Sequence, residues 1–366
     1  MLQYDFLLFQ QISLFNHLLE VNLFKITVFV ITKRILETEG TTFFSFSYKC
    51  ICFFTVSVFL LSCKNEINNK NEIEKNPLSV SFERFDLKFY NNSPDVIPNL
   101  KNEYPFLFPK QFSDSVWINR QKDTLQLLLQ DAVINTFSDL SFLEKKTSSL
   151  FKYIRHYFPK TKIPRIITLT NNVDYQIKTV YLDSLLLISL DTFLGSDHPL
   201  YEGIPYYIRK ELDSKYLLSQ IAEKFASYII PPNENRTFLS NMIYEGKKLY
   251  LQDLILPNEK DEIKIAYTQN EIEWVRENET NIWQYFIENQ TLYKTDPELI
   301  DRFLEPAPFS KFYLQLDNES PGKVGRWIGW QIVKSYHKNN PEISLKKLIK
   351  TSSQELFNLS KYKPKR

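Results

Sequence analysis

The sequence Leu185-Leu186-Leu187-Ile188-Ser189-Leu190 is the clearest indication of the fold, because it is apolar at every position except Ser189. A strand with one solvated face alternates apolar and polar side chains, whereas a strand covered on both faces is a short continuous apolar run. We therefore expect this stretch to be the central strand of a sheet that is buried on both faces.

Other strands are expected upstream of this stretch. Residues 165–170 and 178–182 predict two strands around a turn at Asn171-Asn172. An earlier segment alternates apolar with polar residues, with a slip of phase at Arg84, and its apolar members are Val80, Phe82, Phe85, Leu87 and Phe89. Such a slip predicts a strand with a bulge.

Helical spacing dominates the rest of the chain. Apolar residues predict helices within 125–133 and 143–158, and Pro159 ends the second of these. After Ile204 almost every segment has a helical pattern, and the predicted helices are 215–230, 237–256, 271–288, 297–304, 326–337 and 344–350. A small sheet in the N-terminal half followed by many helices predicts an α+β fold in which helix dominates.

Composition excludes one class of function and limits the covalent chemistry. The 366 residues carry 45 Lys and Arg against 43 Asp and Glu, a net charge of +2. Nucleic-acid binding normally needs a basic surface, so no nucleic-acid partner is expected. The three cysteines are Cys50, Cys52 and Cys63. The chain after them therefore has neither a disulfide nor a thiolate metal site.

The sequence Leu60-Leu61-Ser62-Cys63 closes an apolar run over residues 51–61, and a polar tract follows it. The run has the length of a signal-peptide core and is too short to span a bilayer as a helix. A small residue before a cysteine fits bacterial lipoprotein processing. We expect cleavage between Ser62 and Cys63 and attachment of acyl chains, such as palmitate, to Cys63, which then anchors the chain to membrane lipid.

These signals predict three segments. Residues 1–62 comprise a signal peptide together with the unusually long stretch ahead of it, and residues 63–77 form a polar tether. Residues 78–366 then form a single globular domain. Only Met1 and Met242 occur in the chain, so we expect translation to begin at a non-standard start codon nearer Lys49.

A pair of predicted helices raises the question of a peptidase site. The first contains Ala222-Glu223-Lys224-Phe225-Ala226, where a zinc peptidase has the pattern H-E-x-x-H. Glu223 matches the glutamate of that pattern, and alanines stand at both histidine positions. The second helix places Glu245 on an apolar stripe, where a third zinc ligand would lie in a peptidase of this kind.

The metal site itself is not expected. The four histidines are His17, His156, His198 and His337, and none lies at ligand spacing. In one interpretation Ala222 and Ala226 let two helices pack closely, and Glu223 reaches solvent or a lysine. In the other, Ala222, Glu223, Ala226 and Glu245 mark the groove of a former peptidase that holds no metal, no cofactor and no catalytic residues. The glycine-rich segment 321–330 lacks a phosphate-loop pattern and predicts close helix packing through Gly325 and Gly329.

Several motifs together resemble the gliding motility lipoprotein GldB family of the Bacteroidetes. Besides the cysteine motif, the resemblance rests on residues 82–86, 188–195, 198–201, 244–247, 282–287, 326–333 and 359–366. It implies a cell-envelope lipoprotein needed for surface gliding, which works beside the gliding motor and the type IX secretion apparatus. The family is similar to predicted zinc peptidases with a zincin-like scaffold, and this chain departs from them at Ala222 and Ala226.

The leading hypothesis is a non-enzymatic, membrane-anchored lipoprotein, most simply facing the periplasm, that assists the gliding machinery by protein–protein interaction. Its scaffold would be zincin-like without the metal site. Two alternatives stay open. One is a cell-envelope hydrolase or peptidase that uses Glu223 and Glu245, and the other is a periplasmic carrier of a peptide or lipid.

Overall fold

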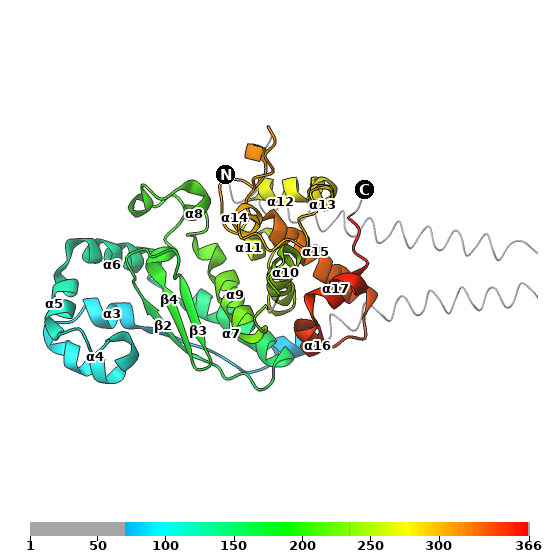
Figure 1. Cartoon of the computed structure of the whole chain (residues 1–366). Coiled ribbons are helices and arrows are strands. Elements are labelled where there is room, and N and C mark those ends of the chain that lie inside the picture. Colours follow the sequence, from blue (N-terminus) through cyan, green and yellow to red (C-terminus); the bar gives the residue numbers. More distant parts are fainter. Residues whose placement is uncertain (1–69, 234, 316, 365–366) are drawn as a thin grey trace, which may run out of the picture. The chain divides into compact units, whose positions relative to one another are not determined.

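The computed structural model describes residues 70–233, 235–315 and 317–364. The chain divides into two units, Met1–Glu72 and Ile73–Arg366, and the labelled elements of Figure 1 belong to the second. The expected signal peptide, the expected translation start near Lys49 and the Ser62–Cys63 processing site lie outside the described residues. The second unit includes the last residues of the expected tether, since Lys152 Nζ on α7 (Ser141–Tyr157) donates a hydrogen bond to Glu74 O at 2.7 Å.

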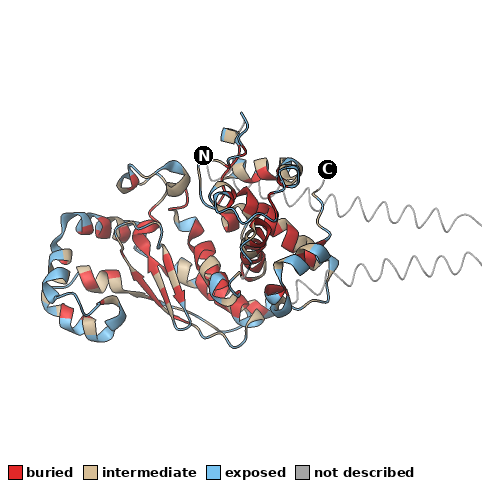
Figure 2. Ribbon diagram, in the orientation of Figure 1, coloured by how far each residue is buried: buried red, intermediate tan, exposed pale blue. Residues whose placement is uncertain are grey.

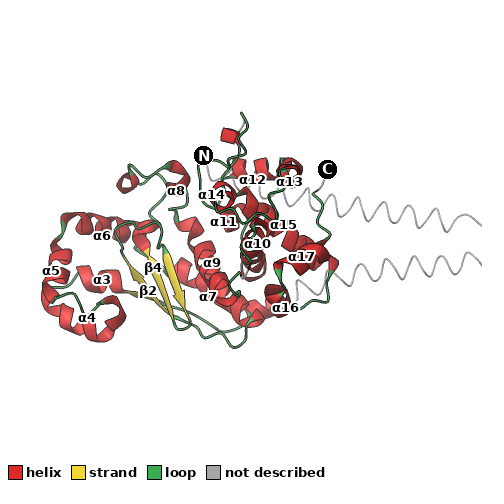
Figure 3. Cartoon of the chain, viewed as in Figure 1, coloured by secondary structure: helices red, strands yellow, loops and turns green. Residues whose placement is uncertain are grey.

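Four strands form one mixed sheet in the order β1-β2-β4-β3, and strands of this sheet are the yellow arrows beside the labels β2 and β4 in Figure 3. Their bounds are β1 Phe82–Arg84, β2 Arg165–Leu169, β3 Thr179–Leu182 and β4 Leu185–Ser189. Strand β4 pairs in parallel with β2 and antiparallel with β3, and β1 pairs in parallel with β2. The prediction of a central strand at Leu185–Leu190 is thus confirmed.

The predicted arrangement of 165–170 and 178–182 was wrong in one respect. Both segments are strands, but β4 lies between them, and β3 forms its hairpin with β4 through Asp183 and Ser184. The chain after β2 is held at the end of β4, because the backbone N–H groups of Asn171 and Val173 donate to the Asp191 carboxylate at 3.0 and 2.9 Å. That contact directs the loop past β4.

The predicted bulged strand was also wrong beyond Arg84, because residues Phe85–Tyr90 form helix α3. Asp86 is buried there and accepts hydrogen bonds from Arg84 Nε at 3.0 Å and from Thr168 Oγ1 at 2.5 Å. A helix places Asp86 and Phe89 on one buried face, at spacing i, i+3. A pattern of apolar residues could not predict this helix, because one of the two side chains on its buried face is the carboxylate of Asp86.

Helices cover both faces of the sheet, which is why β4 is apolar at every position except Ser189. On one face Ile167, Leu185 and Leu187 pack against α3 and α4 (Ile97–Glu103). On the other face Ile166, Leu186 and Ile188 join the main core with α7 and α9 (Leu217–Ile229). Figure 2 shows the strands as a buried layer between these helices.

The C-terminal half is helical, so the predicted α+β class with dominant helix is confirmed. Predicted helix 271–288 is in fact two helices that meet at Asn278. The remaining bounds are α5 Asp114–Lys122, α6 Thr124–Thr136, α8 Tyr206–Arg209, α10 Phe238–Ile255, α11 Asp261–Ile265, α12 Gln269–Glu277, α13 Glu279–Glu288, α14 Glu298–Phe303, α15 Val324–Asn339, α16 Leu345–Lys350 and α17 Ser353–Ser360. In the described part of the chain, none of the helices has the length and apolar character needed to cross a bilayer.

Helices α10 and α15 cross with their backbones in contact. A Cβ atom added to Gly329 would lie 1.8 Å from Met242 O, and one added to Gly246 would lie 2.2 Å from the carbonyl carbon of Gly329. Only glycine fits at either position. The predicted role of Gly329 in close helix packing is confirmed, and Gly246 supplies the matching surface on the partner helix.

Substituting Gly329→Ala should therefore destabilise the fold strongly. Helix propensity favours alanine over glycine by about 1 kcal/mol. Separating two backbones costs more, and we expect a net loss of about 3 kcal/mol in the free energy of unfolding. Chemical denaturation measures this loss, with Lys338→Ala, an exposed change on the same helix, as the control. A Gly329→Ala protein as stable as the control would contradict the crossing.

Candidate functional site

A cleft of about 460 Å³ opens among α8, α9, α10, α11 and the start of α15. Its wall is unusually rich in charge for a concave site, since such sites are mostly apolar. The charged lining residues are Lys178, Glu211, Glu223, Lys224, Glu245, Lys248, Lys264, Glu305, Lys323 and Arg326. The described lining residues include no histidine, cysteine or serine.

Glu223 of α9 and Glu245 of α10 lie in this cleft together, and two cations join them. Lys248 Nζ lies 2.7 Å from Glu245 Oε1 and 3.7 Å from Glu223 Oε1. Arg326 Nη1 lies 3.5 Å from Glu245 Oε2 and 3.6 Å from Glu223 Oε1. The two glutamates singled out from the sequence thus belong to one ion-paired cluster, and Glu223 does reach a lysine.

The cations decide the ionisation of this cluster. Burial by itself would raise the pKa of Glu223, but the charges of Lys248 and Arg326 outweigh burial and hold that pKa below its usual value. Burial likewise opposes the charge on Arg326, and the carboxylates of Glu245 and Glu223 raise its pKa above the ordinary value. Glu223 and Arg326 are therefore both charged at neutral pH.

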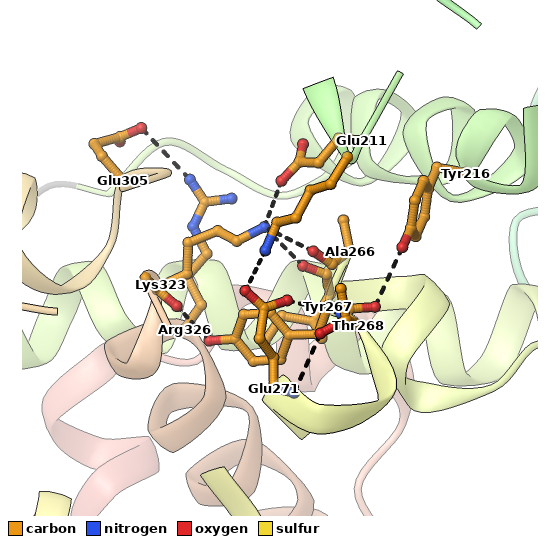
Figure 4. A network of polar contacts seen from close by, with 12 residues as sticks. Glu211, Tyr216, Ala266, Tyr267, Thr268, Glu271, Glu305, Lys323 and Arg326 are labelled. Atoms are coloured by element: carbon orange, nitrogen blue, oxygen red, sulfur yellow. Dashed lines mark hydrogen bonds and ion pairs between the residues drawn. The ribbon is translucent and has the colours of Figure 1, made fainter. Parts of the chain in front are cut away.

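A second cluster lies deeper in the same cleft (Figure 4). Glu211 accepts from Lys323 Nζ at 2.7 Å and pairs with Lys178 at 3.1 Å. Lys323 also donates to the backbone oxygen of Ile265 at 2.9 Å. Burial opposes the charge on Glu211, but Lys323 and Lys178 together lower its pKa to about 2.

Lys323 stands at a strained point of the backbone. Its φ of 64° is left-handed, a conformation that a residue with a Cβ rarely adopts, and it immediately precedes α15. The preceding residue is fixed as well, because Tyr267 Oη donates to Gly322 O at 2.5 Å. The buried ammonium bonds of Lys323 hold this turn, and the turn sets where Arg326 emerges from the first turn of α15.

The alanines of the predicted groove lie elsewhere. Ala222 and Ala226 have no exposed surface and belong to the main core, and neither lines the cleft. Of the four residues assigned to the groove, the structure brings Glu223 and Glu245 together at the cleft and places the two alanines behind it. Among the described residues, no group of three or more His, Cys, Asp and Glu side chains could hold a metal ion.

Sequence reasoning missed five charged residues of the two clusters: Lys178, Glu211, Lys248, Lys323 and Arg326. Lys248 follows Glu245 by three positions on a helix, so its ion pair was accessible from spacing alone. Arg326 and Lys323 were noticed only within a glycine-rich segment. Their role depends on how α15 crosses α10, which no local pattern reveals.

The fold and the cleft define a helix-rich α+β protein with an ion-paired site and no recognisable metal or nucleophile motif in its described lining. Residues 66–364 match the family described as gliding motility protein GldB. The chain belongs to this family, which is one of gliding motility lipoproteins. No curated protein and no solved structure matches the chain.

The two glutamates should differ in their contribution to stability. Glu245→Gln removes the shortest contact of Lys248, whose side chain is only 10% exposed, and should cost about 3 kcal/mol. Glu223→Gln leaves Lys248 and Arg326 paired with Glu245, so its cost should be about 1 kcal/mol. Urea denaturation of both variants, with exposed Glu342→Gln as the control, measures the order. A larger loss of stability in Glu223→Gln than in Glu245→Gln would contradict the arrangement of ion pairs described here.

Acid should destabilise the protein through Glu211. Its pKa falls from 4.5 to about 2 on folding, so this carboxylate stabilises the fold above pH 4.5 and loses that contribution as the pH falls toward 2. The contribution is about 3 kcal/mol. Measurement of the free energy of unfolding between pH 6 and pH 2 tests this. Glu211→Gln should be less stable at neutral pH and should show a shallower decline in acid, and an unchanged slope would count against the assignment.

Proposed function

We propose that this protein is a membrane-anchored accessory lipoprotein of the gliding machinery, and that it acts by binding a partner protein at the charged cleft rather than by catalysis. Family membership supports the link to gliding motility. The expected acylation of Cys63 would supply the membrane anchor, since several acyl chains together hold a protein stably at a bilayer. A periplasm-facing position and partners in the gliding or type IX secretion apparatus belong to the same proposal.

One observation carries the choice of binding over catalysis: Glu223 and Glu245 are both neutralised by Lys248 and Arg326. A general acid or base needs a pKa near the working pH. The pKa values of Glu223 and Glu211 are instead held low by their cation partners. A set of fixed opposite charges suits recognition, because it provides a specific electrostatic pattern for a partner to match.

We also propose that the cleft derives from a zincin-like peptidase scaffold. The support is that Glu223 and Glu245, the two residues that match the peptidase pattern, share one cleft. An ammonium and a guanidinium group now lie beside both carboxylates and neutralise them, as a metal cation would. Elemental analysis of the purified full-length protein tests this view, and stoichiometric zinc would favour the alternative of an active hydrolase.

Complementation of a deletion strain tests the proposed function. The deletion should abolish single-cell gliding, and the wild-type gene should restore it. Cys63→Ala should fail to restore gliding, because a protein without acyl chains loses its anchor. Glu223→Gln should restore it poorly although the protein accumulates normally, because the variant keeps both cations paired but alters the charge pattern of the cleft.

Glu342→Gln serves as the matched control, since Glu342 is exposed and lies outside the cleft. Immunoblots must show equal amounts of each variant in the membrane fraction. Normal gliding in the deletion strain would discard the link to motility. Normal gliding with Glu223→Gln, at wild-type protein level, would remove the cleft from the proposal while leaving the anchored lipoprotein in place.

A further inference from the structure

One cation of the cleft lining makes no ion pair with any described residue, whereas the other lining cations are all paired. Lys178 and Lys323 share Glu211, while Lys248 and Arg326 are paired with Glu223 and Glu245. Arg326 also approaches Glu305, and Lys264 pairs with Asp253 at 2.8 Å. The remaining lining cation is Lys224, which has no ion pair within 4 Å among the described residues. Lys224 is thus the lining cation without a direct ion pair in the described part of the chain, and its charge acts on Glu223 only at longer range.

An unpaired amide lies beside that cation. Gln220 lines the cleft with 7% of its surface exposed, and its side chain has no hydrogen bond to any described residue. Gln220 and Lys224 are four residues apart on α9, so their side chains are neighbours on one face of the helix. The amide of Gln220 therefore has hydrogen-bonding capacity that a ligand in the cleft can use.

A second glutamine with an unpaired amide group lies on the facing helix. Gln252 of α10 lines the cleft, is 1% exposed, and its Oε1 accepts no hydrogen bond from the described residues. It lies one turn beyond Lys248, just as Gln220 lies one turn before Glu223. Lys248 and Glu223 approach each other to 3.7 Å, so the two glutamines extend the same cleft from its ion-paired centre.

We propose that the cleft binds a peptide segment that carries a carboxylate, with Lys224 and Gln220 holding the carboxylate and Gln252 bonding an adjacent peptide group. This rests on the proposed function and names the chemistry of the partner. A glutamine amide carries one donor group and one acceptor, as a peptide group does, so it suits a backbone better than a second charge. An ammonium beside an amide donor supplies two hydrogen bonds to the two carboxylate oxygens.

The carboxylate has two possible sources, an acidic side chain and a chain terminus. The experiment separates them with three pools of random hexapeptides that carry an uncharged BODIPY fluorophore, titrated against the purified full-length protein by fluorescence polarisation. The first pool contains one Asp and an amidated C-terminus, and the second has no acidic residue and a free C-terminus. The third has neither carboxylate. N-acetylaspartate serves as a competitor that has the carboxylates without a peptide.

We expect the first or second pool to bind about tenfold more tightly than the third, which is the usual contribution of a charge-assisted contact. Lys224→Gln should remove this preference, and Gln220→Leu should weaken the favoured pool. Lys338→Gln, an exposed change outside the cleft, should alter nothing. Competition by N-acetylaspartate should require far higher concentrations than competition by unlabelled peptide.

Equal binding of all three pools, binding of none, or an unchanged preference in Lys224→Gln would each overturn the proposal. So would displacement by N-acetylaspartate at the concentration of the peptide, because the site would then be one for small carboxylates. Failure here is distinct from failure of the proposed function. If Glu223→Gln impairs gliding while no peptide pool binds, the cleft serves motility through a partner of different chemistry.

Discussion

The contact between Gly246 and Gly329 is the constraint on which the rest of the site depends. It brings the backbones of α10 and α15 together at a distance that no side chain could tolerate. Glu245 adjoins one of these glycines, and Arg326 lies three residues before the other. The crossing therefore delivers a carboxylate and a guanidinium to the same place, and the 3.5 Å ion pair between them follows from backbone packing.

The charges of the cleft are stabilised by one another rather than by solvent. Taking an ion out of water costs several kcal/mol, and that cost is offset only where partners are close and well oriented. Glu211 and Lys323 satisfy this condition, because the lysine also donates to a backbone oxygen of α11. The same bonds hold the left-handed residue before α15, so the electrostatics and the course of the backbone are fixed together.

Sequence patterns predicted the strands and most of the helices, because these depend on spacing within one element, which the order of residues records directly. The nearness of Glu223 and Glu245, which lie on two helices, was predicted from their likeness to a peptidase pattern. Helix α3 escaped prediction because a buried residue of its first turn is Asp86, a carboxylate that a hydrophobic pattern cannot detect. The strand order also escaped, since it depends on Asp191 capturing the loop after β2 from a position twenty residues away.

The packing of Glu74 against α7 limits where the cleft can operate. Ile73 is the first residue of the compact unit, and it follows Cys63 by ten positions. Ten residues at full extension span at most about 35 Å. If Cys63 carries its expected acyl chains, the first residue of the folded unit stays within that distance of the membrane surface. A partner segment would then have to reach the cleft close to the membrane, so the anchor determines where in the envelope binding can occur.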